Sequence, residues 1–246
     1  MLLHRYSSPR RRLLDMVCQE AARRGCNDLI NQILDIGTDA NPEIDRHSSI
    51  SAAAEAGHCS TVALLLPRGA SPSYRREDAL SEAAAGGHLD IINLLYPSLT
   101  DSDAGERITH AFTAAVGAGS RVSAQYILDR GFDLNSDEMK LRRRFIFDSA
   151  IRNLKYDMIC WLVLDLGFNI NSYGDDFRLE DCSIVDAMLR GDSEVVRLLF
   201  QLGAKAVNLE NDQIHRRVYM PPIYAKTQEA LDTYLELEKS SKRCLI

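Results

Sequence analysis

The sequence predicts an all-α repeat protein, because two series of glycines run through the chain in step. The first series is Gly25, Gly57, Gly87, Gly119 and Gly191, and the second is Gly37, Gly69, Gly131, Gly167 and Gly203. Successive glycines in each series are 30 to 36 residues apart, or about twice that distance. A recurring interval of this size is typical of an array of small helical units, each packed against its neighbours.

The residues before the first glycine series predict a short inner helix in each unit. Residues 48–57 read SSISAAAEAG, 78–87 read DALSEAAAGG and 110–119 read HAFTAAVGAG. An apolar residue and a small residue three positions later share one helical face. The alanines favour helix and let a neighbouring helix approach closely, and the glycine ends the helix by adopting positive φ.

A second apolar run follows each glycine and predicts an outer helix. Residues 62–66 read VALLL and residues 195–200 read VVRLLF. A polar stretch rich in Asn, Asp, Ser and Pro then leads to the next unit. Two units depart from the pattern. Asn153 stands where the fifth unit should have its first glycine, and Pro97 is expected to end the outer helix of the third unit.

This helix–turn–helix–loop unit resembles the ankyrin repeat. Residues 48–58, SSISAAAEAGH, are the best match to the family pattern T-P-L-H-x-A-A-x-x-G-H, although no unit has an intact T-P-L-H. The resemblance covers roughly residues 13–207 and implies an ankyrin-type solenoid of about six repeats. The expected units are 13–45, 46–76, 77–107, 108–143, 144–180 and 181–212.

The ends and the later units carry further expectations. Residues 1–12 are basic and contain Pro9, which predicts disorder, whereas residues 13–212 form the array. Within residues 213–246, an irregular connector precedes an amphipathic helix at 225–239, which is expected to cap the last repeat. Longer finger loops are predicted at 133–144 and 169–180, and Phe145 and Phe147 are expected to fill the seam between units four and five.

Composition argues against several classes of ligand. The chain has 246 residues and a formal net charge of −6, whereas nucleic-acid binding needs a basic surface. The sequence contains no stretch of about 20 apolar residues, so no membrane span is predicted. Residues 1–12 lack the apolar run of a secretory signal. The six cysteines form no zinc-type pattern, so we expect reduced thiols, no metal and no cofactor, in the cytoplasm or the nucleus.

The family resemblance implies recognition of another protein through the concave groove and the finger loops. Aromatic residues flanked by charges suit an interface, although they could equally fold onto their own loops, and both interpretations stay open. His58 and His88 are expected to make local hydrogen bonds. The predicted binding residues are Tyr74, Arg75, Arg76, Glu55, Arg152, Tyr173, Asp176, Phe177, Arg178 and Arg190.

An alternative function is a cofactor-independent enzyme that acts on a small molecule by acid–base chemistry in a pocket on the concave face. His110, Asp148 and Glu82 are the candidate catalytic residues, since each could move a proton. His110 stands where the family has threonine, at the expected start of an inner helix. A third interpretation, a secreted effector on the same scaffold, is neither supported nor excluded by the sequence.

Overall fold

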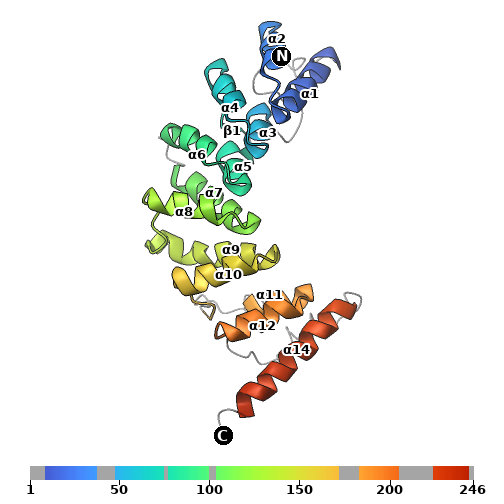
Figure 1. Ribbon diagram of the computed structural model, residues 1–246, viewed down its shortest axis with the longest axis vertical. Helices are drawn as coiled ribbons and strands as arrows, with labels where there is room; N and C mark the ends of the chain where they lie inside the picture. The colour runs from blue at the N-terminus through green and yellow to red at the C-terminus, as the bar shows by residue number, and fades with distance from the viewer. Residues whose placement is uncertain are drawn as a thin grey trace, which may run out of the picture. The chain divides into compact units, whose positions relative to one another are not determined.

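The computed structural model describes residues 9–37, 48–74, 77–99, 104–171, 183–204 and 224–243 (Figure 1). The chain divides into two compact units, residues 1–132 and 133–246. Each unit is treated by itself below. Nearly all of the described residues of both units are helical, which confirms the predicted all-α fold class.

The described residues of the first unit include four helical hairpins. The inner helices α1, α3, α5 and α7 pack successively against one another, and each also packs against its own outer helix. The hairpins are α1 (Pro9–Arg23) with α2 (Asn27–Asp35), α3 (Ser49–Glu55) with α4 (Cys59–Leu65), α5 (Ala79–Gly86) with α6 (Leu89–Leu95), and α7 (Ala104–Ala118) with α8 (Arg121–Asp129).

Alanines hold the inner helices of the first unit close together. Ala53, Ala83 and Ala115 are completely buried, as are the larger side chains of Ile50 and Phe112. A small side chain at the contact lets two helix backbones approach, while the larger apolar residues fill the space between inner and outer helices. The alanine pattern in the sequence therefore predicted the packing correctly.

Side-chain caps and a positive-φ glycine define the ends of the inner helices in the second and third hairpins. The Ser48 hydroxyl accepts a hydrogen bond from the Ser51 backbone N–H at 3.2 Å, and the Asp78 carboxylate accepts one from Leu80 N–H at 3.2 Å. Both side chains satisfy N–H groups that a helix start leaves unpaired. At the other end of α5, Gly87 takes φ of 81°. Pro97 lies in a 3-10 turn directly after α6, as expected.

Three inner helices begin earlier than the sequence predicted. α1 starts at Pro9, so residues 9–12 are helical instead of disordered, and residues 1–8 lie outside the described residues. α7 starts at Ala104 and α9 at Asp137, before the expected unit boundaries at 108 and 144. The prediction of a finger loop at 133–144 is therefore wrong from Asp137 onward, where the chain is already helical. Of the loop predicted at 169–180, residues 172–180 lie outside the described residues.

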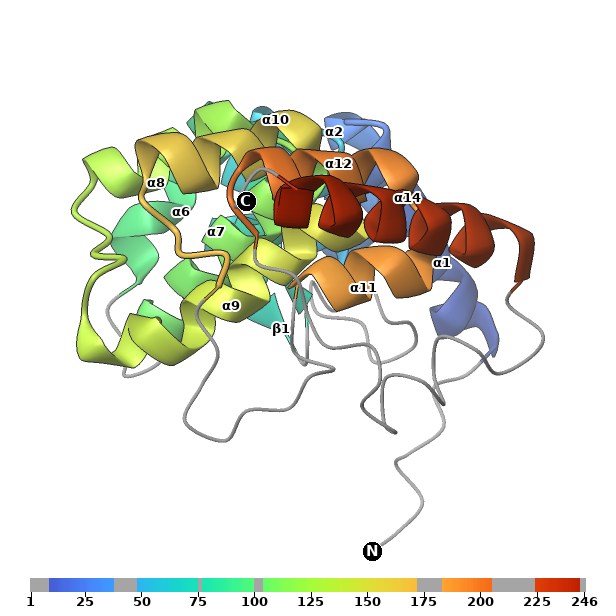
Figure 2. The same ribbon diagram turned by 90° about the horizontal axis from the view of Figure 1, so that it is seen from below.

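Within its described residues, the second unit has two helical hairpins and a final helix. They are α9 (Asp137–Arg152) with α10 (Tyr156–Cys160), which continues into a π-helical segment (Trp161–Asp165), and α11 (Ser183–Arg190) with α12 (Ser193–Gln201). Figure 2 shows α9 and α11 on one side of this unit and α10 and α12 on the other. The last helix, α14 (Tyr224–Arg243), packs against α11 and α12 and buries Ala230 and Tyr234, as predicted for a cap.

The π-helical segment is the structural result of a single inserted residue. Gly57 and Gly69, the two positive-φ glycines of the second hairpin, are 12 residues apart, whereas Leu154 and Gly167 are 13 apart. The extra residue is absorbed where Leu166 N–H donates to the Trp161 carbonyl at 3.2 Å, five residues back. A one-residue insertion in a helix commonly takes this form.

The fifth repeat turns at Leu154, not at Asn153 as the sequence suggested. Asn153 has φ of −101° and closes the helix, while Leu154 has φ of 55°. Lys155 N–H donates to the Ala150 carbonyl at 2.9 Å, as His58 N–H does to the Ala53 carbonyl in the second repeat. Leu154 therefore holds the structural position of the missing glycine.

Replacing Leu154 with glycine is expected to stabilise the protein. The left-handed conformation costs a non-glycine residue about 1–2 kcal/mol. Glycine avoids this cost, but its greater freedom stabilises the unfolded chain and offsets part of the gain. Leu154 is 43 % exposed, so little packing is lost. We expect the free energy of unfolding to rise by about 0.5–1 kcal/mol in urea titration. Asn153→Gly, at the position with negative φ, should lower it or leave it unchanged.

Candidate functional site

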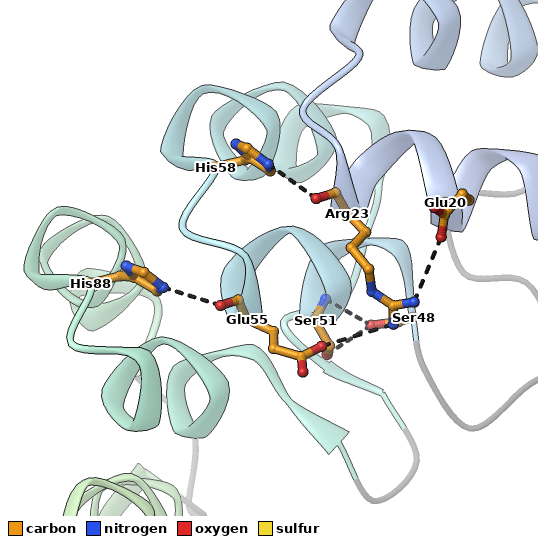
Figure 3. Close-up of polar contacts among 7 residues, drawn as sticks. All are labelled: Glu20, Arg23, Ser48, Ser51, Glu55, His58 and His88. Atoms are coloured by element: carbon orange, nitrogen blue, oxygen red, sulfur yellow. Dashed lines mark hydrogen bonds and ion pairs between the residues drawn. The ribbon is translucent and has the colours of Figure 1, made fainter. Parts of the chain in front are cut away.

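The candidate interaction site of the first unit is the exposed side of α1 and α3, where ionised side chains link two repeats (Figure 3). Glu20 contacts Arg24 at 2.7 Å and Arg23 at 3.6 Å, and Arg23 reaches Glu55 of the next repeat at 3.8 Å. These side chains are 43–71 % exposed. Ion pairs so open to water contribute little stability and exchange readily for other partners. We call Glu20, Arg23 and Glu55 the ion-pair chain.

Two histidines fix the backbone that carries this chain. His58 Nε2 lies 3.0 Å from the Arg23 carbonyl, and His88 Nε2 lies 3.1 Å from the Glu55 carbonyl (Figure 3). Each histidine belongs to the repeat after the one it contacts, so these bonds join neighbouring repeats and are not local as predicted. They hold the C-terminal ends of α1 and α3, where Arg23 and Glu55 project from the surface.

A β-hairpin forms the finger between the second and third repeats. β1 (Ser73–Tyr74) pairs antiparallel with β2 (Glu77–Asp78), with Tyr74 opposite Glu77. The backbone of Tyr74, one of the predicted binding residues, therefore lies in this finger. Arg75 and Arg76, which were also predicted to bind, lie outside the described residues.

A buried ion pair at the base of this finger was missed by the sequence reasoning. Arg107 of α7 donates to Asp78 Oδ1 at 3.1 Å, and the two side chains are only 10 % and 12 % exposed. The same Asp78 oxygen caps α5. The pair connects residues 29 positions apart, and the only signal for it in the sequence is an aspartate at the capping position. It anchors the finger base to the fourth repeat.

The three residues of the enzymatic alternative are divided between the two units. His110 is not at a helix start as predicted but inside α7, exposed, with Nε2 3.8 Å from Glu106. Glu82 is a half-buried residue of α5. Asp148 belongs to the second unit, where it is buried and pairs with Arg144 at 3.5 Å. A hollow of about 300 Å³ in the first unit, lined by His88, Cys59 and Asp90 among others, includes none of the three.

Predicted binding residues of the second unit are only partly described. Arg152 and Arg190 are exposed at the ends of α9 and α11. Tyr173, Asp176, Phe177 and Arg178 lie outside the described residues.

Arg143, one of three consecutive arginines at 142–144, contacts the end of an outer helix. Arg143 donates to the carbonyls of Leu166 and Gly167 at 3.3 and 3.2 Å and stacks on Phe168 at 4.3 Å. It therefore serves to close the end of the outer helix of its own repeat.

Thiol and metal chemistry find little support in the described part of the chain. Burial raises the pKa of the Cys18 thiol, although a hydrogen bond from Ser49 partly opposes this, so Cys18 stays a neutral core residue at neutral pH. Cys18, Cys26, Cys59 and Cys160 are free. No three His, Cys, Asp or Glu side chains among the described residues gather to hold a metal ion. No helix of the described residues is long and apolar enough to cross a membrane.

Stacked helical hairpins with a β-finger define a repeat protein of the kind that binds other molecules through its surface. The family described as "Ankyrin repeats (3 copies)" matches residues 19–106, so this part of the chain is similar to ankyrin repeats. The crystal structure of the human ASB11 ankyrin repeat domain is similar to it, with 21 % sequence identity, a TM-score of 0.55, and coverage of 92 % of this chain and 98 % of the other. That likeness extends the ankyrin fold beyond residue 106. No curated protein matches the sequence.

Proposed function

We propose that the chain is a non-enzymatic interaction module that binds another protein through the ion-pair chain and the neighbouring finger. Ankyrin repeats are generally protein–protein interaction modules. The observation that carries the proposal is the exposed linkage of Glu20, Arg23 and Glu55 across two repeats. Its members are charged, open to water and held on ordered helix ends, which is the arrangement a polar partner needs.

The physical basis is a rigid support under exchangeable contacts. Buried alanines and the histidine–carbonyl bonds fix the inner helices, so a partner does not have to order them on binding. The ion pairs on top are weak in water and are replaced by pairs with the partner once water is excluded. Tyr74 and Arg76, both predicted from the sequence to bind, are of the aromatic and cationic types that often dominate interfaces.

The test compares the proteins retained from a cell extract by three immobilised forms of the full chain. One is wild type, and one carries Arg23→Ala, Glu55→Ala, Tyr74→Ala and Arg76→Ala. The third is a matched control with changes on the exposed outer helices, Ala63→Ser, Asp90→Ala and Gln125→Ala. We expect quantitative mass spectrometry to identify a partner protein whose retained amount falls by about tenfold or more with the quadruple variant and stays unchanged with the control.

Two results would contradict the proposal. Equal retention by the quadruple variant and wild type would exclude this surface. A wild-type chain that retains no protein above the level of an unrelated immobilised domain would exclude the interaction function itself.

A further inference from the structure

One position of the repeat lies nine residues before the positive-φ residue that follows the inner helix. Its role changes in the three repeats whose inner helix begins early. In α3 and α5 this position holds Ser48 and Asp78, whose side chains cap the helix. In α1, α7 and α9 the helix begins before it, and the equivalent residues Met16, His110 and Phe145 lie within the helix. Met16 and Phe145 are 54 % and 66 % exposed, and the His110 side chain is 61 % exposed. The position thus becomes a free surface position wherever the helix is extended.

Phe145, in the second unit, is the aromatic member of this set. The sequence placed it in a buried seam with Phe147, but only Phe147 is buried, against Phe168 at 6.3 Å between ring centroids. Ser149 and Arg152 follow Phe145 by about one and two helical turns and share its face, whereas Ile146 and Ile151 point into the core. An aromatic side chain is therefore displayed on the same face of α9 as an exposed cation, about two helical turns before it.

The stretch of α9 that carries Phe145 is positive in a chain that is negative overall, although Arg143 and Arg144 already contact other groups of the second unit. Residues 142–152, RRRFIFDSAIR, contain four arginines and one aspartate, while the protein carries −6. The aspartate, Asp148, is buried and already contacts Arg144. Arg152 is exposed at the end of α9 and makes no ion pair with any side chain in the described part of the chain. The surface around Phe145 thus has an apolar centre with cationic charge at its C-terminal side.

We propose that Phe145, Ser149 and Arg152, here named the α9 stripe, dock an acidic peptide segment that carries an apolar or aromatic anchor. The inference assumes the interaction function but uses a surface of the second unit that is distinct from the ion-pair chain. Burial of the Phe145 ring supplies the apolar contact, and the Arg152 guanidinium accepts a carboxylate in a two-point hydrogen-bonded pair. Aromatic and arginine side chains together are the residue types most enriched in interface hot spots.

The test selects short random displayed peptides on the immobilised full-length protein. We expect the enriched sequences to contain Asp or Glu on both sides of Phe, Trp, Tyr or Leu. Synthetic peptides from the enriched set should bind wild type in fluorescence anisotropy, and salt should weaken the binding. Phe145→Ser and Arg152→Glu should each weaken it by about tenfold or more.

Leu164 provides the matched control, because it is 70 % exposed on the outer side of the same unit. Leu164→Ser should leave peptide affinity unchanged, and all three exposed substitutions should leave the melting temperature nearly unchanged. Enrichment of basic or neutral peptides, or no enrichment, overturns the α9 stripe as a docking site. Acidic peptides that bind Phe145→Ser as well as wild type but lose affinity for Arg23→Ala would also overturn it, while leaving the interaction function intact.

Discussion

Replacing Arg107 with alanine is expected to lower the free energy of unfolding by about 3 kcal/mol, because the change leaves the Asp78 carboxylate buried without its cation. The two side chains are 10 % and 12 % exposed and lie 3.1 Å apart. Asp78 must stay in place, since the same oxygen also caps α5. Chemical denaturation monitored by far-ultraviolet circular dichroism measures the loss.

The exposed pair of Arg68 and Asp35 supplies the comparison. Its atoms are closer, at 2.8 Å, but its side chains are 38 % and 67 % exposed. Water screens such a pair, so Arg68→Ala should cost less than about 1 kcal/mol. The double variant Arg107→Met with Asp78→Asn keeps a capping side chain and removes both charges, and should recover much of the loss. Equal costs for Arg107→Ala and Arg68→Ala would show that burial of the pair does not matter.

Gly57→Ala is expected to lower the free energy of unfolding by about 2–3 kcal/mol. Gly57 has φ of 81°, and an added Cβ would lie 2.6 Å from Cε1 of the His88 ring. The left-handed conformation costs alanine about 1–2 kcal/mol. Displacing His88 also breaks its contact with the Glu55 carbonyl, which is worth about 1 kcal/mol. Urea titration of the purified variant measures the sum.

Gly69→Ala separates the two contributions. Gly69 has φ of 89°, but nothing lies within 4 Å of the position of an added Cβ, so only the conformational cost of about 1–2 kcal/mol should remain. In a His88→Ala background, Gly57→Ala should fall to the same smaller cost. If Gly57→Ala and Gly69→Ala are equally destabilising in the wild-type background, the histidine contact contributes nothing.

The features that the sequence predicted are local and repeated. Gly57 and Gly87 were assigned to helix ends because each follows an alanine-rich helix and glycine readily adopts the positive φ that ends a helix. The cap at Tyr234 followed from apolar spacing within one helix. Each of these inferences needs only a few neighbouring residues. The helix-end pattern also recurs in several repeats, so it is observed more than once in the sequence.

The features that were missed depend on long-range contacts or on the count of residues. The pair of Arg107 and Asp78 joins two repeats, and no spacing rule links them. Leu154 was passed over because asparagine tolerates positive φ better than leucine, but the backbone bond from Lys155 to Ala150 places the turn one residue later. The sequence named Glu55 as a binding residue but not Arg23, with which it forms an ion pair.

The change in role at the position of Ser48, Asp78 and Phe145 affects how related sequences should be compared. A single alignment column contains helix caps from some repeats and outward-facing side chains from others. Averaging that column into one consensus would combine side chains that pair with the backbone and side chains that face water. A designed array that copied the average would place serine or aspartate inside the extended helices, where no helix start is left for them to cap.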